Sequence, residues 1–397
     1  MVPSERSRFH QTADRQRNRR MIWLAALSAM IWVYLLFFHG QFWQAGPILP
    51  LSPRVSATSV TVVIPARDEA ESIARCLRSL ALQDHRALHV IMVDDASSDG
   101  TGDIARAIAA ETFPNRLPGW LQVIAGKPRP AGWSGKLWAV HQGVAAARDD
   151  ILLLTDADIE HAPGHIASLL AQAESKDLDM TSEMVALNVE SWPERALVPA
   201  FVFFFQMLYP FARVNDPLSA TAAAAGGTVM IRRRALKRIG GIESLHGALI
   251  DDVTLAGRVK TGGPIWLGHS ALARSIRPYP HPADIWRMIA RTAFVQLRFS
   301  WTMLVLTVLG MLIVWIAPPA LAMFGHGVAR WLGLAAWLGA MASYLPTLKR
   351  FGLSPLWALA LPVIAGFYTA ATIGSAIDHA TGRGVRWKSR AYTEHTA

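Results

Sequence analysis

The sequence is poor in cysteine and in charge. Cys76 is the only cysteine, so the chain can form neither an internal disulfide nor a cysteine-based metal site. Cys76 falls within a predicted helix, where we expect it to act as a small buried apolar residue. Only 17% of the 397 residues are charged and 52% are hydrophobic. This balance is too apolar for an ordinary cytosolic enzyme.

The apolar residues gather at the two ends of the chain. Met21 to Phe38 carries no charge and is long enough to cross a hydrocarbon layer of about 30 Å as a helix. A cleavable signal peptide is the alternative, but no small-residue cleavage site follows, which favours an uncleaved anchor. Three further spans are predicted after residue 300, at Thr302 to Phe324, Val328 to Leu345 and Leu356 to Ile377.

The net charge of +10 comes largely from three segments: the first twenty residues, Arg232 to Lys237, and the tail after Gly382. Beside apolar spans, such basic segments more often meet anionic lipid headgroups than nucleic acid. We therefore expect membrane lipids as partners and no nucleic acid.

The middle of the chain alternates between strand and helix patterns. Such alternation predicts an α/β domain with βαβ units on a mostly parallel, Rossmann-like sheet, with ligands at the carboxyl ends of the strands. The predicted strands are Val60 to Ile64, Leu88 to Val93, Leu121 to Ala125 and Ile151 to Leu154, and the helices are Glu69 to Leu82, Gly100 to Ala110 and Leu137 to Ala147. The predicted organisation is a basic segment (1–20), an anchor (21–45), a linker (46–59), the α/β domain (60–300), C-terminal membrane helices (301–378) and a basic tail (379–397).

Acidic residues follow three of the predicted strands. Clustered carboxylates repel one another and need a cation or a hydrogen-bonding ligand. The pair Asp156 and Asp158, with no His or Cys nearby, suits Mg²⁺ or Mn²⁺, which can also bridge a diphosphate and stabilise its departure. For the pair Asp94 and Asp95 the alternative is a helix N-cap. The strand-end residues singled out here are Pro65, Arg67, Glu69, Asp94, Asp95, Asp156 and Asp158.

Lys136 lies at the predicted start of a helix, after Gly135. The pattern is not a Walker A loop, because Pro130 and Leu137 replace the required glycine and Ser/Thr. A lysine at a helix N-terminus still offers charge and backbone N–H groups to a phosphate. The alternative is an exposed lysine on a solvated face.

Together, the runs VTVVIPARDEAESIARCLRSL, VDDASSDGT and TDAD resemble glycosyltransferase family 2, which has the GT-A fold. The stretch GWSGKLWA resembles a subgroup, the hopene-associated glycosyltransferases. The likeness extends over about residues 60–300. It implies that Pro65, Arg67, Glu69, Asp94, Asp95, Lys136, Asp156 and Asp158 bind the donor, and that Asp156 and Asp158 hold the metal, Asp158 more directly.

The resemblance also implies roles in the second half of the domain. Gly226 and Gly227 match the acceptor-side strand, and Asp252, assisted by Asp251, stands where relatives carry the catalytic base. Asp251 replaces the usual Glu, so the division of labour between the two stays open, and a helix N-cap pair is the alternative. Arg298 is an acceptor-side candidate, although a headgroup anchor is the commoner role of such an arginine. The stretch RTAFVQLRFSW departs from the Gln-x-x-Arg-Trp motif of processive relatives, which argues against a polysaccharide synthase.

These features predict a multi-pass protein of the inner membrane that transfers a sugar from a nucleotide-diphosphate donor, most simply a UDP-sugar, to a lipid acceptor such as a hopanoid. The reaction is expected to be inverting and metal-dependent. We expect the catalytic domain in the cytoplasm with its donor, although the basic first twenty residues favour the opposite orientation. The alternatives are a nucleotidyltransferase and a non-catalytic membrane scaffold.

Overall fold

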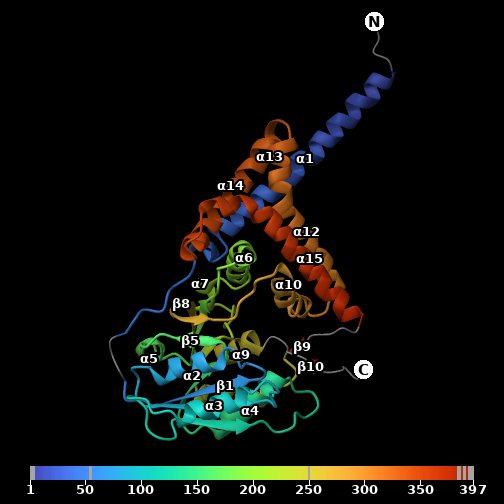
Figure 1. The fold of residues 1–397 in the computed structure, drawn as a ribbon. Helices are drawn as coiled ribbons and strands as arrows, with labels where there is room; N and C mark the ends of the chain where they lie inside the picture. Colours follow the sequence, from blue (N-terminus) through green and yellow to red (C-terminus); the bar gives the residue numbers. More distant parts are fainter. Residues whose placement is uncertain (1–4, 53–55, 249–250, 382–385, 388–389, 392–397) are drawn as a thin grey trace. The chain divides into compact units, whose positions relative to one another are not determined.

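The computed structural model describes residues 5–52, 56–248, 251–381, 386–387 and 390–391. Parts of the predicted linker and most of the basic tail lie outside these residues. The chain divides into two units, each described by itself (Figure 1). The α/β unit comprises Gly46–Glu190, Tyr209–Pro280 and His379–Ala397, and the helical unit comprises Met1–Ala45, Ser191–Leu208 and His281–Asp378. The predicted domain 60–300 therefore contains two segments of the helical unit.

The α/β unit is built on a mixed eight-stranded sheet with the order β3-β2-β1-β4-β7-β6-β8-β5. The first four strands in this order are parallel, as the alternating pattern predicts, whereas β7 runs antiparallel to both β4 and β6. The strands are β1 (Val60–Ala66), β2 (Leu88–Asp94), β3 (Leu121–Ala125), β4 (Ile151–Thr155), β5 (Ile159–His161), β6 (Met180–Ala186), β7 (Thr228–Arg232) and β8 (Ile265–Ser275).

Apolar side chains of the parallel strands and of the helices that follow them form the core of this unit. Cys76 is fully buried in this core, as predicted. Gly143 allows close packing of a helix on β1, because a Cβ there would lie 2.4 Å from Cγ1 of Val63. The remaining elements are α2 (Ile73–Ala81), α3 (Thr101–Ala110), α4 (Gly135–Ala146), α5 (His165–Ser175), α7 (Phe211–Val214), α8 (Arg233–Arg238), η2 (Ile242–Leu245), α9 (Asp251–Lys260), β9 (Arg386–Trp387) and β10 (Arg390–Ala391).

The helical unit contains the apolar ends of the chain. Three helical segments among the described residues are long and apolar enough to cross a membrane: Arg15–Phe37, Trp301–Phe324 and Pro355–Ala380. The elements of this unit are α1 (Glu5–Phe37), η1 (Phe42–Gln44), α6 (Trp192–Leu208), α10 (Pro282–Ala290), α11 (Ala293–Gln296), α12 (Trp301–Met311), η3 (Leu312–Ile316), α13 (Ala317–Phe324), α14 (Gly327–Arg350), η4 (Pro355–Ala360) and α15 (Leu361–Ala380).

Two of the three predicted C-terminal spans are among these segments, and the middle one is a helix that is not. It forms α14, a helix of 24 residues that is not among the three apolar segments. Glycine, proline, tyrosine and tryptophan dilute the aliphatic residues of α14, which lowers its mean hydropathy.

A π-helical turn, η3, joins α12 to α13 and is tied to α1. Pro318 and Pro319 lack the N–H groups that would bond carbonyls one turn earlier. Oγ of Ser28 donates to the carbonyl of Ile313, and Nε1 of Trp32 donates to that of Val314, each at 2.9 Å. Because an apolar environment penalises unpaired backbone groups, these two contacts stabilise the irregular turn.

An interfacial segment and a core helix are the two alternatives for the apolar stretch 197–211, which lies mostly in α6. This helix is packed within its own unit: the Tyr368 hydroxyl donates to the carbonyl of Leu197 at 2.9 Å, and the ring of Phe203 meets that of Tyr344 at 5.0 Å. The contacts favour the core helix.

Candidate active site

The loops after β1 and β2 are joined by hydrogen bonds. The N–H of Asp68 donates to Oγ of Ser97 at 3.0 Å, and the N–H of Ala70 donates to a carboxylate oxygen of Asp99 at 2.9 Å. Because β1 and β2 are parallel neighbours, their carboxyl ends meet at one edge of the sheet. Because the resemblance predicts donor binding here, we call this the donor edge and use the term for Arg67, Glu69, Asp95, Lys136, Asp156, Asp158 and Asp252.

Asp95 and Asp94 have different surroundings. Asp95 is 3% exposed and accompanies Arg67, whose Nη1 donates to the Asp95 carbonyl at 2.5 Å and lies 3.6 Å from its carboxylate. Asp94 instead accepts a hydrogen bond from the N–H of Ser97 at 2.9 Å, which holds the turn before α3. The helix N-cap that the sequence offered as the alternative belongs to neither residue, because α3 begins after Gly100 and has no side-chain cap.

Pro65 is buried inside β1 rather than in the loop. The pairing of β1 with β4 extends only from Val60 to Val63, so the missing N–H of Pro65 interrupts no hydrogen bond on that side. The proline thus lies beyond the end of the pairing with β4, where β1 is still paired with β2.

Lys136 is held at the donor edge by Asp156. Its Nζ lies 2.7 Å from Oδ1 of Asp156, and 22% of the lysine side chain is exposed. Burial opposes the charge, but Asp156 and Asp251 raise the pKa of Lys136 above its usual value. Ser134 caps α4 by accepting the N–H of Leu137 at 3.2 Å, which fixes the turn that carries the lysine. These contacts do not fit a lysine on a solvated face.

Asp251 and Asp252 begin α9. One oxygen of Asp252 accepts the N–H of Val253 at 2.8 Å, and the other accepts the N–H of Gly226 at 2.9 Å. Burial, followed by the charge of Asp251, raises the pKa of Asp252 to about 6, while Lys136 acts in the opposite direction. The aspartate thus begins a helix and also provides a carboxylate with a pKa suited to a base near neutral pH.

Gly226 and Gly227, which the resemblance assigns to the acceptor side, link Asp252 to the end of β4. The carbonyl of Gly227 accepts the Thr155 hydroxyl at 2.8 Å, at the end of β4 that carries Asp156. A Cβ added at Gly226 would lie 3.2 Å from Oδ2 of Asp252 and 3.6 Å from Nζ of Lys136. Gly226 therefore permits the close approach of a carboxylate and an ammonium group to the backbone.

Asp158 is paired with Arg277, a residue that the sequence analysis did not identify. Nε of Arg277 lies 2.6 Å from Oδ2 of Asp158, and its Nη2 lies 2.8 Å from Oε1 of Glu69. Burial opposes the charge of this guanidinium, but Asp158 and Glu69 raise its pKa further.

Both carboxylates predicted to bind a divalent ion are paired with basic side chains. Lys136 occupies an oxygen of Asp156 and Arg277 an oxygen of Asp158. No group of three or more His, Cys, Asp or Glu side chains among the described residues is arranged to hold a metal. In this arrangement the pair does not fit an ion bound by both carboxylates, and the predicted metal role of Asp156 and Asp158 stays a prediction.

The last predicted site residue, Arg298, lies in the helical unit, just after α11. Its backbone has a φ of 52°, in the left-handed region. Its predicted role at the acceptor stays a prediction.

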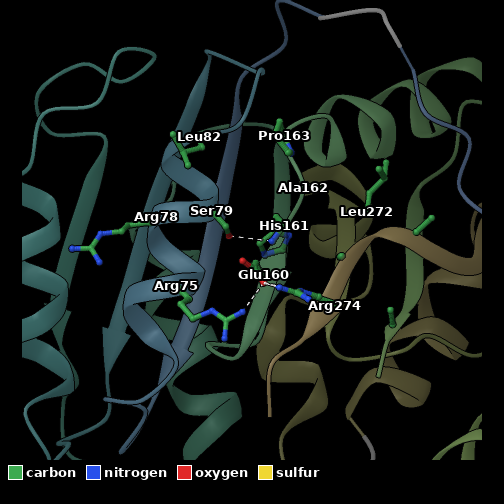
Figure 2. Close-up of a pocket in the computed structure, with 13 residues that line it drawn as sticks. Arg75, Arg78, Ser79, Leu82, Glu160, His161, Ala162, Pro163, Leu272 and Arg274 are labelled. Carbon is green, nitrogen blue, oxygen red and sulfur yellow. Dashed lines mark hydrogen bonds and ion pairs between the residues drawn. The ribbon is translucent and has the colours of Figure 1, made fainter. Parts of the chain in front are cut away.

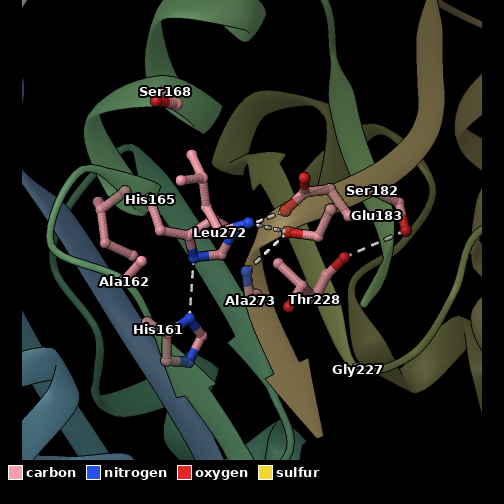
Figure 3. Close-up of polar contacts among 12 residues, drawn as sticks. His161, Ala162, His165, Ser168, Ser182, Glu183, Gly227, Thr228, Leu272 and Ala273 are labelled. Atoms are coloured by element: carbon pink, nitrogen blue, oxygen red, sulfur yellow. Dashed lines mark hydrogen bonds and ion pairs between the residues drawn. The ribbon is translucent and has the colours of Figure 1, made fainter. Parts of the chain in front are cut away.

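A buried polar network joins residues of β5, α5 and β6 (Figure 3). Nδ1 of His161 lies 2.9 Å from Nδ1 of His165, whose Nε2 lies 2.6 Å from Oε2 of Glu183. His165 and Glu183 are fully buried, and burial followed by the charge of His165 lowers the pKa of His161 well below its usual value. The sequence analysis missed this network, although the four-residue spacing of the two histidines is a visible signal.

A cavity of about 540 Å³ opens between α2, β5 and β8 (Figure 2). Arg75 and Arg274 both contact Oε2 of Glu160 there, at 2.9 and 2.7 Å. No residue of the donor edge lines this cavity. Its two arginines share one carboxylate, and they offer control residues on the same unit for variants of the donor edge.

The fold is similar to that of a solved glycosyltransferase. A mannosyltransferase from Pyrobaculum calidifontis, solved in complex with GDP-Man and Mn²⁺, superposes with a TM-score of 0.54 at 19% identity, covering 93% of this chain and all of that one. With the mixed sheet and strand-end site described above, this likeness confirms the GT-A fold.

Residues 61–240 match the model described as "Glycosyl transferase family 2". The chain is 31% identical over 115 residues to a 4,4'-diaponeurosporenoate glycosyltransferase of Staphylococcus haemolyticus, covering 29% of this chain and 28% of the relative. It is 30% identical over 142 residues to a polyprenol monophosphomannose synthase of Mycolicibacterium smegmatis, covering 34% of this chain and 50% of the relative. The matches span half or less of each of these two relatives, and they support glycosyltransferase family 2 for the matched segment.

Proposed function

We propose that this protein is a membrane-bound family 2 glycosyltransferase that moves a sugar from a nucleotide-diphosphate donor to a lipid acceptor with inversion at the anomeric carbon. The observation that carries the proposal is the meeting of Lys136, Asp156 and the Asp252 carboxylate at one edge of the sheet. An anion-binding cation therefore lies beside a carboxylate whose pKa is about 6.

In this reaction the acceptor hydroxyl oxygen attacks the anomeric carbon, and the bond from that carbon to the diphosphate oxygen breaks. Asp252 accepts the hydroxyl proton as the new bond forms. Lys136 offers its positive charge to the nucleoside diphosphate as it departs. Attack from the face opposite the leaving group inverts the anomeric configuration, so no covalent sugar intermediate is needed.

The lipid acceptor is proposed from the helical unit and from the relatives. Three segments of the chain are apolar enough to span a membrane, and the names of two relatives specify a polyprenol and 4,4'-diaponeurosporenoate. A hopanoid or another polycyclic or polyprenyl lipid fits this class. The solved relative with GDP-Man and Mn²⁺ makes GDP-sugars, beside UDP-sugars, and Mn²⁺ the first ligands to test.

The test is to incubate the full chain in detergent with a panel of nucleotide sugars and a bacterial lipid extract, with Mn²⁺, with Mg²⁺ and with a chelator. We expect release of a nucleoside diphosphate and a glycosylated lipid, both lost in Asp252→Asn. Asp103→Asn is the matched control, because Asp103 is an exposed residue of α3 that pairs with Arg106 on the same helix. If no nucleotide sugar binds under any condition, the proposal fails; pyrophosphate release from a nucleoside triphosphate and a sugar phosphate would favour a nucleotidyltransferase.

We further propose that the α/β unit faces the cytoplasm, at the inner membrane, where nucleotide sugars are made. Because Cys76 is buried, a cysteine introduced at Leu117, which is 81% exposed, would be the main accessible thiol. In intact spheroplasts a membrane-impermeant maleimide should leave Leu117→Cys unlabelled, and lysis should allow labelling. Labelling before lysis would place the unit outside, as the basic first twenty residues favour.

A further inference from the structure

Arg277 brings a permanent positive charge to the predicted donor site. It follows β8 and reaches Asp158 and Glu69, whose side chains are 11% and 13% exposed. A guanidinium is protonated at every pH that proteins tolerate, so it compensates these two carboxylates without any bound ion. A divalent ion at Asp158 would have to share that carboxylate with a like charge.

Two backbone N–H groups also hold the chain after β8 in place. The N–H of Ile276 donates to the carbonyl of Asp158 at 2.8 Å, and the N–H of Arg277 donates to Oγ of Ser275 at 3.3 Å. The backbone thus fixes the segment beside the Asp156–Asp158 turn. The side chain of Arg277 is consequently available for a role in ligand binding.

The guanidinium also has capacity left for a ligand. Nε and Nη2 make its two contacts with carboxylates, and 37% of the side chain is exposed. Among the residues that the structure describes, Nη1 makes no hydrogen bond. Planar guanidinium groups bind phosphate oxygens with two parallel hydrogen bonds, which a single ammonium group cannot do.

We propose that Arg277 binds the diphosphate of the donor and takes, at Asp158, the charge-compensating role that the sequence predicts for a divalent ion. The chain therefore binds a nucleoside diphosphate without a divalent ion. This inference rests on the proposed function, because it assumes a nucleotide-diphosphate donor. It concerns how the donor is held and adds no chemical step.

The experiment measures the affinity of the full chain for UDP and GDP by titration calorimetry, in a chelator and in Mn²⁺. We expect the wild type to bind one of the two in the chelator. Arg277→Gln should weaken that binding by about tenfold or more, as expected for loss of a charge-assisted contact. In Mn²⁺ the variant should recover affinity, because the vacated Asp158 can then accept the ion.

Arg274→Gln is the matched control. Arg274 lies three residues away and pairs with Glu160 in the cavity of Figure 2, and its loss should leave nucleotide binding unchanged. Arg277→Lys keeps the charge but not the planar fork, so it should fold like the wild type and bind with intermediate affinity. This second variant keeps the test decisive if Arg277→Gln does not fold.

Two outcomes overturn the inference. The first is that the wild type binds UDP or GDP only with Mn²⁺. The second is that both Arg277 variants bind in the chelator as tightly as the wild type. Failure of the proposed function looks different: in that case neither UDP nor GDP binds to any variant, with or without metal.

Discussion

Lys136 and Arg277 each contact carboxylates of the donor edge, and the surroundings of the two residues differ. Lys136 touches the more exposed carboxylate, that of Asp156, and lies near Gly226, which bonds to Asp252. Arg277 touches Asp158 and Glu69, two nearly buried carboxylates. The lysine therefore influences the ionisation of the proposed base, whereas the arginine balances charge where the donor is proposed to lie. Lys136, Asp156 and Asp252 form the proton-transfer cluster, which is expected to govern proton transfer. Arg277, Asp158 and Glu69 form the binding cluster, which is expected to govern donor binding.

The largest effect is expected from removing the base. Asp252→Asn should lower kcat by about 10²- to 10⁴-fold, the usual contribution of general base catalysis. Donor affinity, measured by calorimetry, should stay within about twofold of the wild type, because the amide keeps the hydrogen bond from Gly226. A large loss of donor affinity would show that Asp252 binds the donor and would contradict its role as the base.

Removing the lysine should have the next largest effect. Lys136→Met should lower kcat/KM by about 10- to 100-fold, the worth of a charged hydrogen bond, as measured by steady-state kinetics. Lys136→Arg keeps the positive charge, so its kcat/KM should fall less than that of Lys136→Met. If the two variants are equally impaired, shape rather than charge explains the role of Lys136.

The pH dependence tests the same cluster. Because the pKa of Asp252 is raised to about 6, its carboxyl is protonated below that pH and cannot accept a proton. The profile of kcat/KM should therefore fall as the pH drops through about 6 and should be flat above it. Lys136→Met should move this limb to higher pH, since the lysine lowers the pKa of Asp252. Arg277→Gln should leave the limb in place.

Replacing the acidic partner of each basic residue by asparagine further distinguishes the roles of the two clusters. Asp156→Asn should move the acid limb of kcat/KM to lower pH, because Lys136, relieved of its partner, favours the ionised Asp252 more strongly. Asp158→Asn should leave the limb unchanged and weaken donor binding. Equal shifts of the limb in both variants would show that the clusters act as one.

The smallest effect is expected at Gly226. A Cβ there would lie 3.2 Å from Oδ2 of Asp252, so the carboxylate must shift by a few tenths of an ångström. Since a displacement of 1 Å costs about 10²-fold in rate, Gly226→Ala should lower kcat by less than about tenfold. Gly257→Ala in α9 is the control, because its Cβ would meet no atom within 4 Å. Equal kcat values for the two variants would show that the close approach at Gly226 does not matter for catalysis.

The parts of the fold that could be predicted are those whose residue pattern lies within a short segment of the chain. Strands β1 to β4 and helices α2 to α4 lie where the alternation of apolar runs and helical spacing predicts them, because each βαβ unit carries its pattern within a short segment. Strands β6 and β8 were not predicted. Their pairing joins Met180 to Ile265, far apart in the chain, and no local pattern specifies it.

The sequence by itself determined the α/β class, the apolar ends of the chain and the acidic residues after β1, β2 and β4, since each of these depends on residue type and short-range spacing. Only the tertiary structure decided which cation meets which carboxylate. Arg277 lies 119 residues from Asp158 and 208 from Glu69, and it reaches both because β8 returns beside β5. Charge pairing acts through space, so the partner of a buried carboxylate is fixed by strand order rather than by position in the sequence.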